Sequence, residues 1–98
     1  MADRNRYIVT YDIRSPSRLR KVHGLVVDYG ERLQYSVYIC DLTRVELIRL
    51  RGQLRERMHM EEDSVSIFDL GPPTGRLATR VEHLGAEPQL PTEEPEIW

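Results

Sequence analysis

Asp12 is the residue of this sequence whose position most clearly suggests a chemical role. It closes the run RYIVTYDI, residues 6–13, in which the tyrosines and Val9 share one face of an alternating pattern. Asp12 lies on the opposite face, with Ile8 and Thr10. A carboxylate at the end of a strand caps the turn that follows, or it binds a ligand that needs oxygen donors, such as a divalent cation. Both roles are open at this point.

Few other residues are placed for catalysis. Gln34 and Ser36 lie in an extended stretch, residues 31–42, and are candidates to orient water near the first-strand aspartate. Asp41 and Asp63 stand at strand or loop ends, where turn-forming roles are common. The histidines have no partner at metal-ligand spacing, and the single cysteine cannot form a disulfide within the chain.

The cations are unevenly distributed along the chain. Residues 1–57 hold 12 Lys and Arg against 7 Asp and Glu, whereas residues 58–98 hold 2 against 9. All but one of the 14 cations are arginine, whose planar guanidinium group binds phosphate through paired hydrogen bonds. The candidate nucleic-acid-binding residues are Arg14, Arg18, Arg20, Lys21, Arg44, Arg51 and Arg55. The alternative is that these cations form ordinary exposed ion pairs with Glu46, Glu56 and the acidic C-terminal tail.

Local signals place these residues on alternating strands and helices. Ser15 followed by Pro16 predicts a helix start, and Gly30 predicts its stop. A capping box, formed with Glu46, predicts the start of a second amphipathic helix. The predicted elements are a strand over residues 6–13, a helix over 16–29, an extended stretch over 31–42, a helix from Thr43 to about Arg57, a strand over 64–70 and a possible short strand within 79–84.

This order predicts an α+β fold, a ferredoxin-like sandwich in which an antiparallel sheet carries both helices on one face. The stretch over residues 31–42 contains no Gly or Pro, so it forms either one kinked strand or a very short hairpin. We expect one domain over residues 1–84, followed by an acidic, proline-rich tail over 85–98 that is disordered when alone.

The sheet face without helices is the feature that suggests self-association. It is predicted to carry Ile8, Thr10, Asp12, Ser36 and Tyr38. This set is too apolar for a fully solvent-exposed surface and too polar for the hydrophobic core of one chain. A homodimer that stacks two such faces about a two-fold axis resolves this conflict and brings the two copies of Asp12 near one another. The alternative is a face that meets solvent.

A set of short motifs, taken in order, resembles a known family. The motifs are Tyr11-Asp12-Ile13, the basic helix segment 18–22, Asp28-Tyr29-Gly30, the strand segment 34–38 and the segment 62–65. Over residues 6 to about 70 the chain resembles the small CRISPR-associated adaptation endonuclease family, the dimeric partner of the CRISPR adaptation integrase. One departure is Ser15-Pro16-Ser17, where acidic or Lys residues are often found.

The resemblance implies a ferredoxin-like homodimer, a Mg²⁺ (or Mn²⁺) site at Asp12 and a role in spacer acquisition from invading nucleic acid, duplex DNA or RNA. It also implies that residues 79–84 add a strand to the partner protomer's sheet. Mg²⁺ held by carboxylates polarises a phosphate and activates water, and one or two carboxylates suffice for one ion. The alternative function is a toxin-like, metal-dependent endoribonuclease on the same fold. A module that binds a small ligand is least favoured, because no pocket-forming glycine motif is present.

The ends of the chain add two expectations. The apolar pair Ile97 and Trp98 follows a proline-rich spacer and is a candidate for docking on a partner protein, and the acidic tail could shield the basic body. The polar start and the short aliphatic runs indicate no leader and no membrane span, so we expect a cytoplasmic protein.

Overall fold

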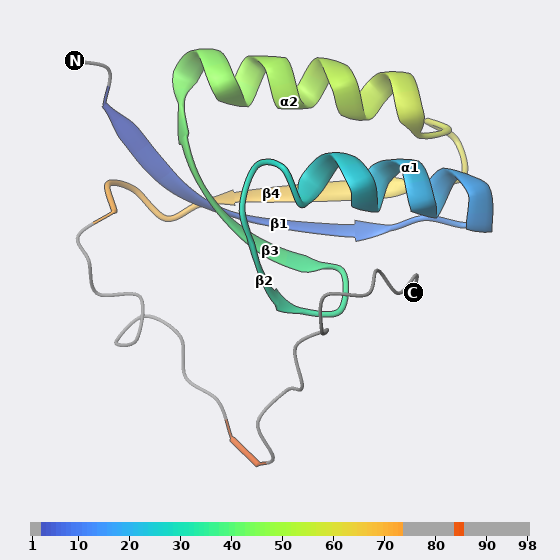
Figure 1. Cartoon of the computed structure of the whole chain (residues 1–98), viewed down its shortest axis with the longest axis horizontal. Helices are drawn as coiled ribbons and strands as arrows, with labels where there is room; N and C mark the ends of the chain where they lie inside the picture. The colour runs from blue at the N-terminus through green and yellow to red at the C-terminus, as the bar shows by residue number, and fades with distance from the viewer. Residues whose placement is uncertain (1–2, 74–83, 86–98) are drawn as a thin grey trace.

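The described part of the chain is an antiparallel sheet with both helices on one side. The computed structural model describes residues 3–73 and 84–85. The elements are β1 (Arg4–Asp12), α1 (Pro16–Val26), β2 (Glu31–Gln34), β3 (Val37–Thr43), α2 (Arg44–Arg57) and β4 (Ser64–Asp69). The strands pair antiparallel in the order β2-β3-β1-β4. Figure 1 shows both helices over the same face of the sheet, so the predicted ferredoxin-like fold is confirmed.

Both predicted helix starts are confirmed. The Ser15 hydroxyl accepts from the backbone N–H of Arg18 at 3.3 Å, with proline in the first turn of α1. Thr43 and Glu46 cap α2 reciprocally, through contacts of 3.1 and 2.8 Å. Neither described helix is long and apolar enough to cross a bilayer.

The end of α1 differs from the sequence-based expectation. The helix stops at Val26 rather than at residue 29, because the backbone N–H groups of residues 28 and 29 donate to carbonyl oxygens three rather than four residues back. Beyond this turn the Tyr29 hydroxyl donates to Gln53 Oε1 of α2 at 2.5 Å. Gly30 is therefore not the helix stop. A Cβ at Gly30 would clash with the carbonyl oxygen of Ile39, so the glycine is required by the close passage of β3.

A two-residue hairpin turn resolves the open question about residues 31–42. β2 and β3 are separate strands joined by Tyr35 and Ser36, and Ser36 has a positive φ of 57°. Two-residue hairpins favour such left-handed backbone, and glycine or asparagine is the usual signal for it. A serine takes this conformation here, which is why the sequence did not mark the turn.

The register of this hairpin overturns one predicted placement. Tyr38 lies opposite Val9 in the β1–β3 pair, so it shares the buried face and is only 1% exposed. Its hydroxyl lies 3.2 Å from Nδ1 of His23 on α1. The prediction that Tyr38 lies on the helix-free face is wrong, because a phenol with a hydrogen-bond partner can be buried. The helix-free face carries Val37 and Ile39 instead.

The core lies between the helices and the tyrosine-bearing face of the sheet. Its fully or nearly fully buried residues are Tyr7, Val9, Tyr11, Val22, Leu25, Val26, Tyr38, Cys40, Leu42, Leu47, Leu50 and Leu54. The helices contribute one buried stripe each, Val22, Leu25 and Val26 in α1 and Leu47, Leu50 and Leu54 in α2. The predicted short strand within 79–84 lies outside the described residues, except for the exposed Leu84.

A buried carboxylate, Asp63, joins the two loops at one end of the sheet. It accepts from the backbone N–H groups of Arg14 and His59, each at 2.8 Å. The Arg18 guanidinium donates to both of its oxygens, Nε to Oδ2 at 2.7 Å and Nη2 to Oδ1 at 3.1 Å. These contacts fix the loop after β1 against the loop before β4.

Hydrogen bonds from Arg18 hold the pKa of Asp63 well below its ordinary range, against the opposing effect of burial. Because the folded-state pKa is lowered, the network stabilises the fold fully above about pH 4, the unfolded value, and the stabilisation is lost as pH falls below it.

The variant Asp63→Asn should therefore unfold more easily at neutral pH, by roughly 2 kcal/mol, because its charge-assisted hydrogen bonds are removed. Its stability should also fall less between pH 5 and pH 3 than that of the unsubstituted chain. Urea denaturation followed by circular dichroism at several pH values measures both effects. The exposed control Glu56→Gln should show the same dependence of stability on pH as the unsubstituted chain. If Asp63→Asn also showed that same dependence, the stabilising role given to the Asp63 carboxylate would be contradicted.

Candidate functional site

Asp12 is an exposed carboxylate on a backbone that is fixed on both sides. The residue before it, Tyr11, donates its backbone N–H to the carbonyl oxygen of Ser36 at 3.2 Å. Two residues later, the N–H of Arg14 donates to Asp63 at 2.8 Å. Within residues 3–73, 84 and 85, no hydrogen bond or ion pair engages the Asp12 carboxylate. The strand end therefore presents an unengaged carboxylate on a fixed stretch of backbone.

The surroundings of Asp12 mix hydroxyl and apolar side chains. Across β4 the register places Ser64 opposite Asp12 and Ser66 opposite Thr10. Further along the same helix-free face, Ile8 lies between Ile39 of β3 and Phe68 of β4. Phe68 is 54% exposed, which is a high value for a phenylalanine on a sheet. The face is thus apolar in its middle and polar at the Asp12 end.

The other two candidate acids already have arginine partners. Asp41 accepts two hydrogen bonds from Arg6, at 2.7 and 2.8 Å, and these contacts lower the pKa of Asp41. Both carboxylate oxygens of Asp63 already accept hydrogen bonds from Arg18. In the part of the chain that the structure describes, no group of three or more His, Cys, Asp and Glu side chains could hold a metal ion.

The described part of one chain therefore offers a Mg²⁺ ion a single carboxylate at this site, with serine hydroxyls beside it. This donor set fits Mg²⁺, which keeps several water ligands and needs only one or two carboxylates. It does not fit zinc, whose structural sites need four nitrogen or sulfur ligands and whose catalytic sites need three protein ligands.

The two residues predicted to support Asp12 are placed differently from each other. Gln34 ends the edge strand β2, which β3 separates from β1. Ser36 lies in the hairpin turn, where its carbonyl oxygen accepts from the backbone N–H of Tyr11 at 3.2 Å. Their action on water bound at Asp12 stays a prediction.

Behind Asp12, two phenols converge on one imidazole nitrogen. The hydroxyls of Tyr11 and Tyr38 lie 3.3 and 3.2 Å from Nδ1 of His23. Burial raises the pKa of each phenol and lowers that of His23, and the nearby Arg32 lowers the pKa of His23 further. His23 is therefore a packing residue with hydrogen-bond partners.

The cations predicted to bind nucleic acid fall into three groups. Arg18 is committed to Asp63 and to Glu62, at 2.7 and 2.8 Å, as part of the fold. Arg14, Arg20 and Lys21 are exposed around α1. The α2 cations Arg44, Arg51 and Arg55 form the third group, described next.

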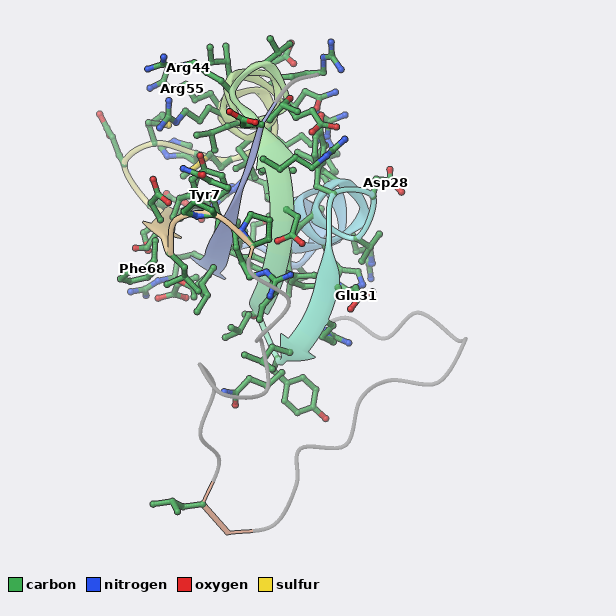
Figure 2. All side chains as sticks on the ribbon, turned by 90° about the vertical axis from the view of Figure 1, so that its left-hand side faces the viewer. Tyr7, Asp28, Glu31, Arg44, Arg55 and Phe68 are labelled. Carbon is green, nitrogen blue, oxygen red and sulfur yellow. The ribbon has the colours of Figure 1, made fainter. Side chains whose placement is uncertain are left out.

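The three α2 cations lie on the same side of the helix. Arg44 and Arg51 line a groove of about 670 Å³ between α2 and the strands β1 and β4. Arg51 and Arg55 line the adjoining hollow of about 210 Å³. Figure 2 shows Arg44 and Arg55 on one side of α2, whereas α1 and the nearby Asp28 lie on its other side. We call these three residues the α2 cation row.

Sequence reasoning missed two cations on the other side of α2. Arg49 and Arg57, with Gln53 between them, line a groove of about 480 Å³ between the two helices. Arg20 and Lys21 line the same groove from α1. The spacing of i, i+4 and i+8 was the available signal, because it places the three side chains on one helix face. The candidate docking residues Ile97 and Trp98 lie outside the described residues.

The chain matches a family model and curated relatives over most of its length. The model of the CRISPR associated protein Cas2 family matches residues 5–74. A CRISPR-associated endonuclease Cas2 from Halalkalibacterium halodurans is 36% identical over 96 residues, which cover 93% of this chain and 97% of the relative. A CRISPR-associated endoribonuclease Cas2 from Synechocystis is 35% identical over 82 residues, 84% of this chain and 86% of the relative.

A solved structure agrees with both the sequence match and the fold. The crystal structure of Streptococcus pyogenes Cas2 superposes with a TM-score of 0.71 at 36% identity, covering 82% of this chain and 99% of that one. The two-helix, four-stranded fold and the family match thus point the same way. The chain belongs to the CRISPR associated protein Cas2 family.

Proposed function

We propose that this chain acts as a homodimer that binds nucleic acid in CRISPR adaptation and cleaves phosphodiesters with Mg²⁺ bound at Asp12. The observation that carries the proposal is the exposed Asp12 carboxylate, which has no partner in the described chain although the backbone on both sides of it is fixed. Relatives named endonuclease and endoribonuclease support phosphodiester chemistry. Both RNA and DNA are candidate substrates.

The helix-free face supports the homodimer. It presents Phe68 at 54% exposure beside Ile8, with the hydroxyls of Ser64 and Ser66 nearer to Asp12. Stacking two such faces about a two-fold axis buries the apolar middle and brings the two Asp12 ends toward the axis. The two Asp12 carboxylates, together with water, would then hold one Mg²⁺ ion.

Bound Mg²⁺ would polarise a phosphate oxygen and lower the pKa of a water ligand. The chain's own contribution is positional, since the Ser36 and Asp63 contacts on either side of Asp12 limit the movement of its carboxylate. Residues 79–84 would add a strand to the partner's sheet, as the family resemblance implies. The exposed edge of β4 is available for such an addition in the described chain.

The α2 cation row supports nucleic-acid binding. Figure 1 shows that α2 ends at the same end of the molecule as β1, so Arg55 approaches the Asp12 end of the sheet. Arginines along a helix contact backbone phosphates and position a duplex without reading its sequence. Doubled by a two-fold axis, this surface would also scaffold the CRISPR adaptation integrase along a duplex, with Ile97 and Trp98 as candidate contacts to the integrase.

The variant Asp12→Asn should lose Mg²⁺-stimulated cleavage by about 100-fold or more, because metal binding supplies several kcal/mol of transition-state stabilisation. The measurement is cleavage of labelled RNA and duplex DNA with Mg²⁺ or with EDTA. Dimerisation and duplex binding should be unchanged. The control Glu56→Gln removes an exposed carboxylate of α2 that lines none of the grooves and should cleave normally. Equal cleavage by Asp12→Asn and the unsubstituted chain would remove Asp12 from the site.

The variant Phe68→Glu should weaken the dimer by at least about tenfold, since a charge would replace a buried aromatic side chain. Because Phe68 is exposed within one chain, the monomer should remain folded. Sedimentation velocity over a range of concentrations measures the effect. Val45→Glu, at a similarly exposed residue of α2, is the control and should leave the dimer intact. A wild-type chain that sediments as a monomer would contradict the stacked-face arrangement.

The variant Arg51→Gln/Arg55→Gln should bind duplex DNA more weakly and with less salt dependence. The slope of log Kd against log salt should fall by about 2, or about 1 for each phosphate that an arginine no longer neutralises. Fluorescence anisotropy in EDTA measures the slope without cleavage. A wild-type affinity that does not change with salt would refute electrostatic binding by the α2 cation row.

A further inference from the structure

The groove between α1 and α2 is a cationic surface that the proposed chemistry does not use. It is lined by Arg20, Lys21, Gly24, Leu25, Asp28, Tyr29, Arg49, Gln53 and Arg57. Four of these residues carry positive charge and one carries negative charge. The groove lies on the helical side of the molecule, whereas Asp12 lies at the end of β1 on the helix-free side. We name it the interhelical groove.

The cations of the interhelical groove are available to a ligand. Within residues 3–73, 84 and 85, no ion pair or hydrogen bond engages the side chains of Arg20, Lys21 or Arg49. Arg57 uses Nη1 to donate to the carbonyl oxygen of Gln53 at 3.1 Å, which directs its guanidinium along the helix. By contrast, the neighbouring Arg18 is fully committed to acidic partners. Like charges gathered without a compensating partner favour an anion.

The wall of the groove is open at Gly24. A Cβ at this position would meet no heavy atom within 4 Å, so nothing inside the chain requires a glycine there. Glycine is unfavourable in a helix interior. Arg20 and Lys21 lie about one helical turn before Gly24, and Asp28 lies in the turn that follows α1, so the missing side chain leaves backbone exposed between charged groups. A ligand can therefore approach the α1 backbone closely at this point.

The dimensions of the groove fit a linear polyanion. Arg49 and Arg57 are eight residues apart on α2, about 12 Å along the helix axis, a length that spans more than one phosphate of a strand. Three of the four cations are arginines, whose forks pair with phosphate oxygens. We propose that the interhelical groove binds backbone phosphates of nucleic acid on the side of the molecule opposite Asp12. The inference rests on the proposed function in that its ligand is again nucleic acid.

The test uses a matched pair of glycine variants that change no charge. Gly24→Gln places a side chain in the groove, whereas Gly52→Gln makes the same exchange on α2 at a residue that lines none of the three grooves described above. Glutamine is a good helix former, so both variants should melt at or above the wild-type temperature, by up to about 4 °C. This measurement shows that each variant is folded.

The probe is a fluorescein-labelled duplex of random sequence, measured by anisotropy in EDTA. Gly24→Gln should weaken binding by about tenfold, whereas Gly52→Gln should bind like the wild type. Arg49→Gln/Arg57→Gln should reduce the salt slope by about 2, in addition to the reduction caused by Arg51→Gln/Arg55→Gln. If the reductions in salt slope caused by the two double variants add, both sides of α2 contact phosphate.

Three results would overturn the inference. Equal affinities of Gly24→Gln and Gly52→Gln, with the salt slope reduced only by Arg51→Gln/Arg55→Gln, would refute the groove and leave the proposed function intact. No salt-dependent duplex binding by the wild type would refute both. If Gly24→Gln left duplex binding unchanged but blocked binding of a synthetic peptide of residues 86–98, the groove would be a site for an acidic peptide instead.

Discussion

The contacts of one buried carboxylate, Asp63, determine the geometry on which the rest of this structure depends. A charge taken out of water is tolerated only when hydrogen-bond donors surround it. Asp63 meets this demand with the Arg18 guanidinium and two backbone N–H groups. Those two N–H groups belong to the loops on either side of the site, so satisfying the charge also fixes the end of β1. The position of Asp12 thus depends on an interaction in which Asp12 takes no part.

Three aspartates that look alike in the sequence differ in whether the fold gives their carboxylates a partner. Asp41 is paired with Arg6 across β1 and β3, and Asp63 with Arg18 across two loops. Asp12 has no partner in the described chain. Arginine pairing removes the first two from chemistry, because their oxygens are already occupied. The residue that can bind a ligand is the one that the fold leaves unpaired at a fixed backbone position.

The arginines divide in the same way. Arg6 and Arg18 serve the fold, whereas the exposed cations of α2 project to two sides of the helix. Because α2 packs through Leu47, Leu50 and Leu54, its remaining surface is split into one side facing β4 and one facing α1. A single basic helix therefore supplies two separate cationic surfaces, and the packing of its leucine stripe decides which arginine belongs to which.

Sequence alone predicted the two helix starts, the strands β1 and β4, the order of the fold and the candidate aspartate. The alternation of residues 6–13, the Ser15 cap and the Thr43–Glu46 box each depend on neighbours within four positions, so the local pattern was sufficient to predict them. Tertiary structure decided the buried side of Tyr38 and the commitment of Arg18 to Asp63. It also decided the close passage of β3 at Gly30. Each of these depends on a partner nine or more residues away, and only the packing of distant segments brings such partners together.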